Sequence, residues 1–201
     1  MPRTKQRTNE LHERGVAAAL AVLAQEGVPG LTTRNVAQRA HASVPAVYEV
    51  FGDKAGLIRE VFFQGFRMLG AALEAVAPGD DPIAALERMA VRYREFVVSN
   101  PVLAEVMFSR PFADFDPTTA EDRAGIRVRK IFVQRVQAAI EAGLIEGDPT
   151  DVALVFFALL NGLAAAENAR RLGSSGRSVN GRWHLAVHAL LEGLRPQAVG
   201  G

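Results

Sequence analysis

Apolar residues recur at intervals of three and four along most of the chain, which is the spacing of one face of an α-helix. Sustained alternation of β-branched and polar residues, the pattern of a strand, is not found. We therefore expect an all-α protein of about nine helices. The expected helices cover residues 6–26, 33–40, 44–51, 54–77, 82–99, 101–109, 117–143, 149–172 and 182–194.

Four Asp-Pro or Asn-Pro pairs set the starts of the later helices. An Asp or Asn side chain accepts hydrogen bonds from the free N–H groups of a first turn, and proline at the first helical position loses none. Glycines stand where helix ends are expected, and the small residues of 173–181 predict a loop. The pairs are Asp81-Pro82, Asn100-Pro101, Asp116-Pro117 and Asp148-Pro149, and the glycines are Gly27, Gly79, Gly143 and Gly173.

Two very short helices follow one another at residues 33–40 and 44–51. Helices of this length are not stable alone, so they must pack against the amphipathic helix 6–26. Val47 and Phe51 are four residues apart and are expected to face inward. A three-helix unit with a small-residue corner is a helix-turn-helix, whose second short helix fits the DNA major groove.

Residues 10–58 resemble the DNA-binding domain of the tetracycline-repressor (TetR) family of transcriptional regulators. The family usually has Gly-Val in the turn, where this chain has His41-Ala42. We expect His41 to adopt the left-handed backbone conformation, which histidine tolerates better than most residues with a side chain. The matching features are Gly27, Leu31-Thr32-Thr33, Val36-Ala37, Ala40, Ser43, Val47-Tyr48, Phe51, Lys54 and Leu57.

The resemblance implies a helix-turn-helix DNA-binding domain at residues 1–53 and a larger helical domain for ligand binding and dimerisation at residues 54–196. Three later segments resemble a TetR subfamily that is named for a Trp-His-Gly signature in its C-terminal half. At the position where the subfamily has His-Gly, this chain has Asn161-Gly162. The segments are NPVLAEVMFSRPF, LLNGLA and RWHLAVHALLEGL.

The DNA-binding candidates divide into phosphate contacts and base contacts. Hydroxyl, phenol and ammonium groups suit phosphate, while apolar side chains at the start of the second short helix suit thymine methyl groups. Thr33 and Ser43 would also serve as plain helix caps, and Arg34 as a solvated surface residue. The phosphate candidates are Thr33, Ser43, Tyr48 and Lys54, and the base candidates are Arg34, Val44, Pro45 and Ala46. Arg3, Lys5 and Arg7 form a basic arm that could also reach DNA.

The second domain holds most of the aromatic residues. These residues are suited to a protein core, and a wall of Phe and Met also suits a cavity for an unknown apolar small-molecule effector. The family resemblance favours an effector site in this region. The ligand-binding candidates are Phe66, Met89, Tyr93, Phe96, Phe108, Phe112, Phe132, Phe157 and Asn161.

The last two expected helices are unusually apolar and need a surface to pack against. The resemblance implies a homodimer formed by these helices as a four-helix bundle, and packing within one subunit is the alternative. The interface candidates are Phe156, Leu159, Leu160, Leu163, Trp183, Val187, Leu190, Leu191 and Leu194.

Composition and charge narrow the class of protein. The chain has 201 residues, no cysteine and a net charge of only +1, so it is no polycation and offers no thiol chemistry. No window offers about 18 uninterrupted apolar residues, as a membrane span requires; VALVFFALLNGLAAAEN comes closest, and Asn161 and Gly162 interrupt it. The N-terminus lacks a signal-peptide pattern, so we expect a cytoplasmic protein.

Enzyme signatures are lacking. His184 and His188 are four residues apart without the HExxH pattern, so we expect no metal, cofactor or catalytic residue. The sequence predicts a ligand-responsive regulator, most simply a repressor that an apolar molecule releases from a pseudo-palindromic operator. The alternative is a binding module of the same fold that does not regulate DNA.

Overall fold

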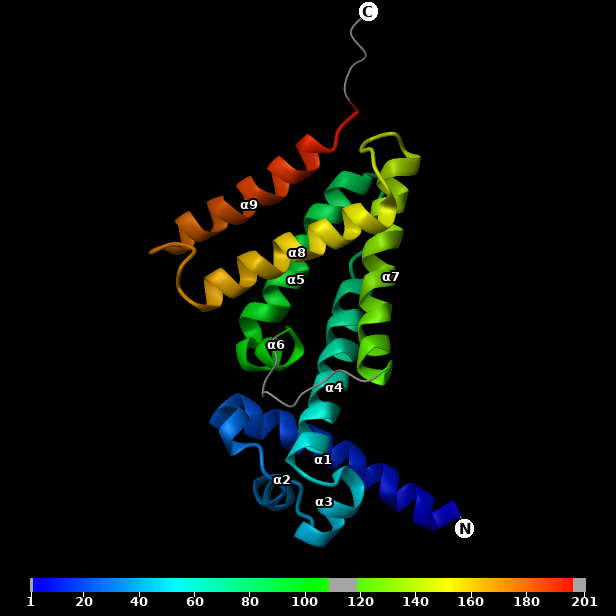
Figure 1. Ribbon diagram of the computed structural model, residues 1–201, viewed down its shortest axis with the longest axis vertical. Helices are drawn as coiled ribbons and strands as arrows, with labels where there is room; N and C mark the ends of the chain where they lie inside the picture. Colours follow the sequence, from blue (N-terminus) through cyan, green and yellow to red (C-terminus); the bar gives the residue numbers. More distant parts are fainter. Residues whose placement is uncertain (1, 109–118, 197–201) are drawn as a thin grey trace, which may run out of the picture. The chain divides into compact units, whose positions relative to one another are not determined.

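The structure is a computed structural model that describes residues 2–108 and 119–196, with side chains from residue 8 onward except those of 119–122 and 124 (Figure 1). The described residues form nine α-helices and no strand, which confirms the all-α prediction. The helices are α1 Pro2–Gly30, α2 Thr33–Arg39, α3 Val44–Phe51, α4 Lys54–Glu74, α5 Pro82–Ser99, α6 Pro101–Phe108, α7 Thr119–Glu141, α8 Pro149–Asn168 and α9 Gly176–Gly193.

Proline and glycine account for most helix boundaries. The side chain of Asp148 accepts hydrogen bonds from Thr150 N and Asp151 N at 2.8 and 3.1 Å, and Asp81 caps α5 in the same way. Positive φ values of 69° at Gly27 and 68° at Gly143 confirm the left-handed conformation that helix ends favour. The φ of Gly27 interrupts α1 three residues before its end.

The predicted loop at 173–181 is wrong for its second half, because α9 begins at Gly176 rather than residue 182. Ser175 caps this helix: its hydroxyl accepts from Ser178 N at 3.2 Å, while the Ser178 hydroxyl accepts from Ser175 N at 3.4 Å. This reciprocal pair satisfies two free N–H groups, so a helix starts in a segment whose Gly and Ser content suggested a loop.

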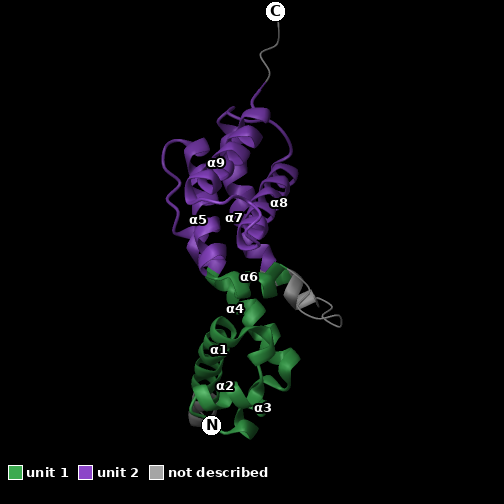
Figure 2. Cartoon of the chain, turned by 90° about the vertical axis from the view of Figure 1, so that its left-hand side faces the viewer, with its two compact units in different colours: residues 1–68, 100–124 green, residues 69–99, 125–201 purple. Residues whose placement is uncertain are grey.

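The chain divides into two compact units (Figure 2). Unit 1 contains residues 1–68 and 100–124, and unit 2 contains residues 69–99 and 125–201. This division differs from the sequence-based boundary after residue 53, since α6 packs against α1 and therefore belongs to unit 1. Helix α4 contributes to both units.

The core of unit 1 is built by α1, α2 and α3, which pack against one another. Val47 and Phe51 of α3 are 0% and 6% exposed, which confirms that they face inward. Phe51 lies so close to Gly15 of α1 that a methyl group on Gly15 would overlap its ring. The short helices are thus stabilised by burial against α1 rather than by their own length.

The core of unit 2 centres on edge-to-face aromatic contacts between α5, α7 and α8. The ring centroids of Tyr93 and Phe157 are 5.7 Å apart. The ring centroid of Phe132 lies 5.4 Å from that of Phe157 and 5.9 Å from that of Phe156. Such pairs stabilise a core beyond the effect of their buried area. Helices α8 and α9 lie side by side in this unit (Figure 1).

Candidate nucleic-acid interface and effector site

The corner between α2 and α3 is built around a left-handed residue. His41 has a φ of 50°, as the sequence analysis predicted, and its side chain is exposed. Ala42 N donates to Ala37 O at 2.9 Å, and Ala40 is 3% exposed. The corner therefore turns tightly on small residues and sets the direction of α3.

Replacing His41 with glycine should stabilise the protein. A side chain in the left-handed region costs about 1 kcal/mol or more, and glycine removes that strain while losing part of the gain to its larger unfolded-state entropy. We expect His41→Gly to raise the free energy of unfolding by about 0.5 kcal/mol and His41→Val to lower it by about 1 kcal/mol. Urea unfolding followed by circular dichroism measures both. Equal stabilities for the two variants would contradict the expectation.

Helix α2 is fixed to the end of α1 by polar contacts. Of Thr32 and Thr33, the two threonines that could cap α2, Thr32 is the cap: its hydroxyl accepts from Asn35 N at 3.2 Å. The Asn35 side chain donates to Glu26 Oε2 at 3.0 Å and to Gly30 O at 2.9 Å. Sequence reasoning did not find Asn35, because its partners depend on how the chain turns after α1.

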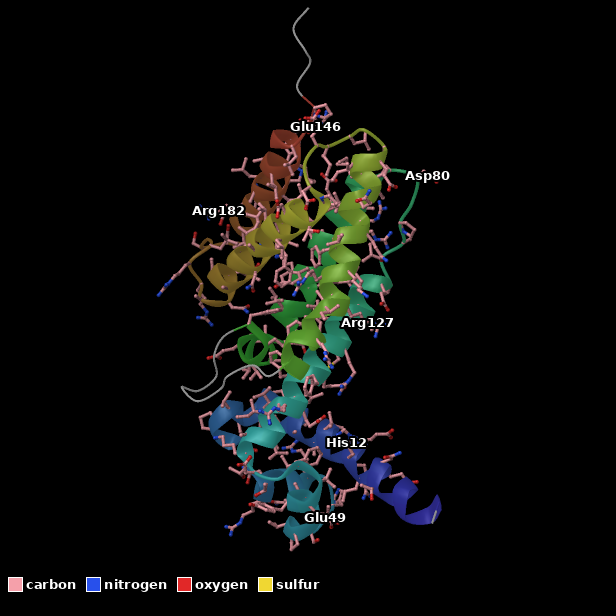
Figure 3. All side chains as sticks on the ribbon, turned by 45° about the vertical axis from the view of Figure 1, so that its right-hand side comes forward. His12, Glu49, Asp80, Arg127, Glu146 and Arg182 are labelled. Atoms are coloured by element: carbon pink, nitrogen blue, oxygen red, sulfur yellow. The ribbon has the colours of Figure 1, made fainter. Side chains whose placement is uncertain are left out.

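Helix α3 presents an exposed side that carries apolar and aromatic residues. Val44 and Tyr48 are 42% and 59% exposed, and Pro45 and Glu49 are exposed as well. Figure 3 labels Glu49 on this helix. Ser43 caps the helix, since its hydroxyl accepts from Ala46 N at 3.3 Å. One side of α3 is therefore buried in unit 1, while the opposite side exposes apolar groups to solvent. Exposed apolar surface of this kind often marks a binding site.

All eight DNA-binding candidates belong to unit 1. Two of them, Thr33 and Ala46, are half-buried. The remaining six are exposed and stand on or next to α2, α3 and the first turn of α4: Arg34, Ser43, Val44, Pro45, Tyr48 and Lys54. The side chains of Arg3, Lys5 and Arg7 lie outside the described residues.

His12 is a second residue that sequence reasoning missed. Its ring stacks on Phe51 with centroids 5.3 Å apart, and its Nε2 lies 3.2 Å from Glu60 Oε2. His12 thereby joins α1 to α3 and α4 within unit 1 (Figure 3). His12 is one of several polar residues in this part of α1, so the sequence gave no signal for these contacts.

The ligand-binding candidates that the structure describes divide between the two units. Met89, Tyr93, Phe96 and Phe132 are at most 8% exposed in unit 2, where Phe157 and Asn161 also lie. The rings of Tyr93, Phe132 and Phe157 pack against one another, as described above. Phe66 and Phe108 contact each other in unit 1 with centroids 5.7 Å apart, and Phe112 lies outside the described residues.

Asn161 has the partner that a polar residue in an apolar helix needs. The Tyr93 hydroxyl donates to Asn161 Oδ1 at 3.2 Å. Burial raises the pKa of the Tyr93 phenol far above its usual range, so the group stays protonated and remains a donor. The pair fixes α8 to α5.

A cavity of about 590 Å³ lies elsewhere in unit 2, between α5, α8 and α9. Val91, Val98 and Val187 supply apolar lining, and Trp183 lines it as well. None of the eight ligand-binding candidates within the described residues lines this cavity. The sequence pattern could not reveal it, because the lining comes from segments about 70 to 100 residues apart.

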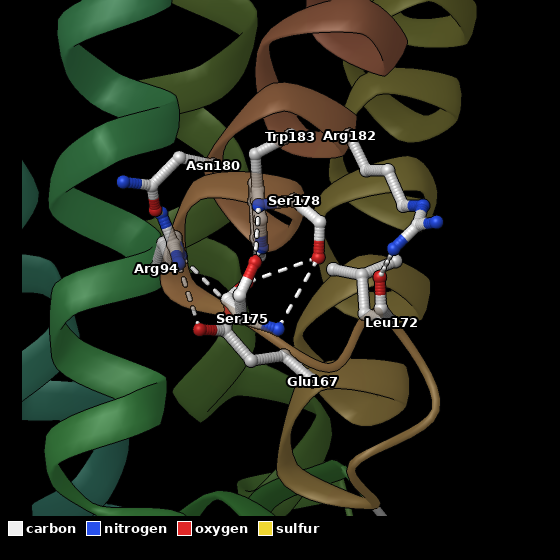
Figure 4. Close-up of polar contacts among 8 residues, drawn as sticks. All are labelled: Arg94, Glu167, Leu172, Ser175, Ser178, Asn180, Arg182 and Trp183. Atoms are coloured by element: carbon white, nitrogen blue, oxygen red, sulfur yellow. Dashed lines mark hydrogen bonds and ion pairs between the residues drawn. The ribbon is translucent and has the colours of Figure 1, made fainter.

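Four of the residues that line this cavity form a polar cluster: Arg94, Glu167, Asn180 and Trp183. Figure 4 shows their contacts. Arg94 donates to both carboxylate oxygens of Glu167 at 2.8 Å, and to Asn180 Oδ1 at 2.8 Å. Trp183 Nε1 donates to Glu167 Oε2 at 2.6 Å, and the Arg94 guanidinium stands 5.3 Å from the Trp183 ring centroid. The cluster links α5, α8 and α9.

The charge of Glu167 makes this cluster sensitive to acid. Hydrogen bonding from Arg94, together with that from Trp183, holds the pKa of Glu167 below its ordinary value of 4.5. Because the folded-state pKa is depressed, this stabilisation is complete above pH 4.5 and is lost as the pH falls through the folded pKa. We expect Glu167→Gln to lower the free energy of unfolding by about 2 kcal/mol at pH 7 and by much less at pH 3.

Urea unfolding at both pH values tests this expectation. Glu141→Gln, on the exposed end of α7, is the matched control, and its cost should be small at either pH. A Glu167→Gln deficit that is the same at pH 3 as at pH 7 would show that the carboxylate charge is not responsible.

The structure buries five of the nine interface candidates within the subunit. These are Phe156, Leu160, Trp183, Val187 and Leu191, each at most 6% exposed. Of the others, Leu163 and Leu194 are less enclosed, as are Leu159 and Leu190. Leu154, Val155 and Leu185, which were not candidates, are 46%, 54% and 65% exposed. The surface available to a partner on α8 and α9 therefore includes these three side chains.

Helix α8 is long and apolar enough to cross a membrane by length and composition, with a mean hydropathy of 1.6. A single such helix is weak evidence, since core helices of soluble proteins have the same composition. Only 28% of it is buried, which leaves a broad apolar side exposed in the single chain.

Comparisons with protein families match both units. The family model for the tetracyclin repressor-like C-terminal domain matches residues 86–190, more than half of the chain. The model for bacterial regulatory proteins of the tetR family matches residues 16–61. The second match contains α2 and α3.

A stretch of 91 residues is 36% identical to the HTH-type transcriptional regulator BetI of Burkholderia ambifaria and 35% identical to that of Burkholderia pseudomallei. The match covers 44% of this chain and 47% of the relatives, so the chain spans about half the length of the curated relatives it matches.

Solved structures resemble more than nine-tenths of the chain. A protein of unknown function from Rhodococcus sp. RHA1 superposes with a TM-score of 0.80 at 28% identity, over 92% of this chain and 96% of that one. The TetR family transcriptional regulator PfmR from Thermus thermophilus superposes with a TM-score of 0.67 at 19% identity, over 91% and 100% of the two chains. The likeness to PfmR shows the fold alone.

Proposed function

The chain belongs to the tetracycline-repressor (TetR) family of regulatory proteins, and from this we propose that it is a homodimeric, DNA-binding transcriptional repressor whose affinity for DNA is lowered by a small molecule. The observation that carries the DNA-binding role is the exposed side of α3. Val44 and Tyr48 face solvent there, while Val47 and Phe51 hold the helix to unit 1.

DNA contact would begin with the phosphates. Thr33, Ser43, Tyr48 and Lys54 would bind phosphate oxygens and fix the position of α3 in the major groove. Capping by Ser43 does not prevent this, since a hydroxyl that accepts one hydrogen bond can still donate its own proton.

Base reading would be mostly apolar. Val44, Pro45 and Ala46 at the start of α3 would contact thymine methyl groups, and Arg34 of α2 would donate to a guanine edge. Because so few residues would contact base edges, we expect modest sequence specificity for each half-site. The sequence-dependent shape of DNA and the second subunit would supply the remaining specificity.

Dimerisation would use the exposed apolar side of α8 and α9. Leu154, Val155 and Leu185 are exposed apolar side chains, and a cluster of such side chains favours contact with a partner. Leu159 and Leu163 lie further along α8. A two-fold axis would require a pseudo-palindromic operator with half-sites about one helical turn apart or a multiple of it.

The small molecule would act through α4, the helix that contributes to both units. A ligand that binds one position of α4 more tightly than another would change the separation of the two α3 helices. The size of the response would be set by the difference between its affinities for the two states.

Selection of bound duplexes from a random DNA pool at near-physiological salt tests the DNA-binding role. We expect a palindromic motif, and we expect its affinity to fall steeply as added salt competes for phosphates. A folded dimer that selects no motif would refute the regulator. That result would favour the second candidate, a ligand-binding module of the same fold, which the 590 Å³ cavity in unit 2 supports.

A further inference from the structure

We infer that the cavity between α5, α8 and α9, defined by Arg94, Glu167 and Trp183 and called here the α5–α9 groove, binds a hydrophobic organic cation. Its volume of about 590 Å³ falls within the range of small-molecule sites. Three valines, Val91, Val98 and Val187, supply an apolar lining for the body of such a molecule.

The charge of the lining favours a cation. Among the described residues that line the groove, three carboxylates stand against one guanidinium, a formal net charge of −2. Glu167 and Arg94 neutralise each other through their two hydrogen bonds of 2.8 Å. Glu87 and Glu95 therefore carry the excess charge, and both belong to α5.

The spacing of these two carboxylates suits a bulky ion. Eight residues along a helix correspond to a rise of about 12 Å, so Glu87 and Glu95 flank the groove rather than contact each other. Glu95 also lies 3.1 Å from Arg92, but both side chains are about half exposed, at 56% and 48%. An exposed pair of this kind is weak and leaves the glutamate attractive to a ligand.

An anion of the same size would be disfavoured. The cationic group in the lining, Arg94, already donates to Glu167 and Asn180, so an anion would have to displace a carboxylate to reach it. The indole of Trp183 lines the groove, but the Arg94 guanidinium already stands 5.3 Å from its ring centroid. The attraction for a cation therefore comes from the carboxylates of Glu87 and Glu95.

Binding in the α5–α9 groove concerns unit 2 alone and does not depend on DNA. Only its consequence, that the cation is the effector, rests on the proposed function. A test of binding and a test of DNA release can therefore fail separately.

Tetraphenylphosphonium is a suitable probe, and tetraphenylborate is an anion of nearly the same size and shape. Trp183 is the single tryptophan of the chain and lies in the groove, so its fluorescence reports occupancy directly. We expect tetraphenylphosphonium to change the Trp183 emission saturably and to bind the full chain at least tenfold more tightly than tetraphenylborate. Calorimetry gives the dissociation constants independently.

Charge-removing variants test the residues. Glu87→Gln with Glu95→Gln should raise the dissociation constant of tetraphenylphosphonium about tenfold and weaken its dependence on salt. Glu141→Gln, which removes the same charge from the exposed end of α7, should leave the dissociation constant unchanged.

Three results would overturn the inference: no saturable binding of the cation, equal binding of both ions, or an unchanged dissociation constant in the double variant. If the cation binds as expected but leaves operator affinity unchanged at saturation, the site stands and the effector role is refuted. Failure to select any operator would refute the regulator and leave the groove untouched.

Discussion

Replacing both Arg34 and Tyr48 with alanine is expected to weaken operator binding by about 1,000-fold. Each subunit loses one guanidinium and one phenol from the exposed side of α2 and α3. Contacts of this kind are worth about 1 kcal/mol each, and a dimer loses four of them, or about 4 kcal/mol. Titration of a labelled operator at fixed salt measures the loss.

The single variants separate positioning from reading. Tyr48→Phe keeps the ring and removes the hydroxyl, so it should weaken all sequences about equally if the phenol binds phosphate. Arg34→Ala should relax the preference at one base position if the guanidinium reads guanine. Arg129→Ala, an exposed arginine of α7 in unit 2, is the matched control and should change affinity less than about twofold.

Folding of the double variant must be intact for this result to count. Arg34 and Tyr48 are both exposed, so neither substitution opens a cavity, and the unfolding midpoint should stay near that of the wild type. An unchanged operator affinity in a folded double variant would remove the exposed side of α3 from the DNA interface.

The sequence predicts the helices well because their signals are local. Apolar spacing of three and four residues identifies each helix, and Asp148-Pro149 or Asp81-Pro82 sets its start within one turn. The same is true of the left-handed His41, whose position follows from the corner between two short helices. The start of α9 was missed, since the Ser175–Ser178 pair is a weaker signal than the glycines around it.

Which surface an apolar helix face packs against depends on residues far away in the sequence, so the sequence predicts it less well. Trp183, Val187 and Leu191 share one face of α9, and the spacing predicts that face correctly. It cannot say whether the face meets its own chain or a second copy, and the structure buries all three inside the subunit. Leu185, on another side of the helix, is 65% exposed.

The α5–α9 groove depends on the same non-local information. Arg94 and Glu167 are 73 residues apart in sequence, so no motif joins them. Phe and Met side chains line a cavity only where they leave space between them. The rings of Tyr93, Phe132 and Phe157 instead pack against one another. The aromatic pattern therefore predicts the packing of these three rings in the core of unit 2, and their role in ligand binding stays a prediction.

The junction between α3 and α4 makes Gly56 the residue with the largest expected effect on stability. A methyl group at Gly56 would overlap the carbonyl oxygen of Phe51, a backbone atom that cannot rotate away. Gly56 N also donates to Asp53 Oδ1 at 3.1 Å, and this cap would be displaced. We expect Gly56→Ala to lower the free energy of unfolding of unit 1 by about 3 kcal/mol.

Two probes distinguish unit 1 from unit 2 in the measurement. Trp183 fluorescence follows unit 2, while circular dichroism follows the helices of both units. In urea, Gly56→Ala should lose part of its helical signal well before the Trp183 emission changes. Gly181→Ala is the control, since Gly181 of α9 has open space around it, and there alanine should stabilise by about 0.5–1 kcal/mol. A Gly56→Ala protein with the wild-type midpoint in both probes would show that α3 and α4 do not approach each other as closely as the structure places them.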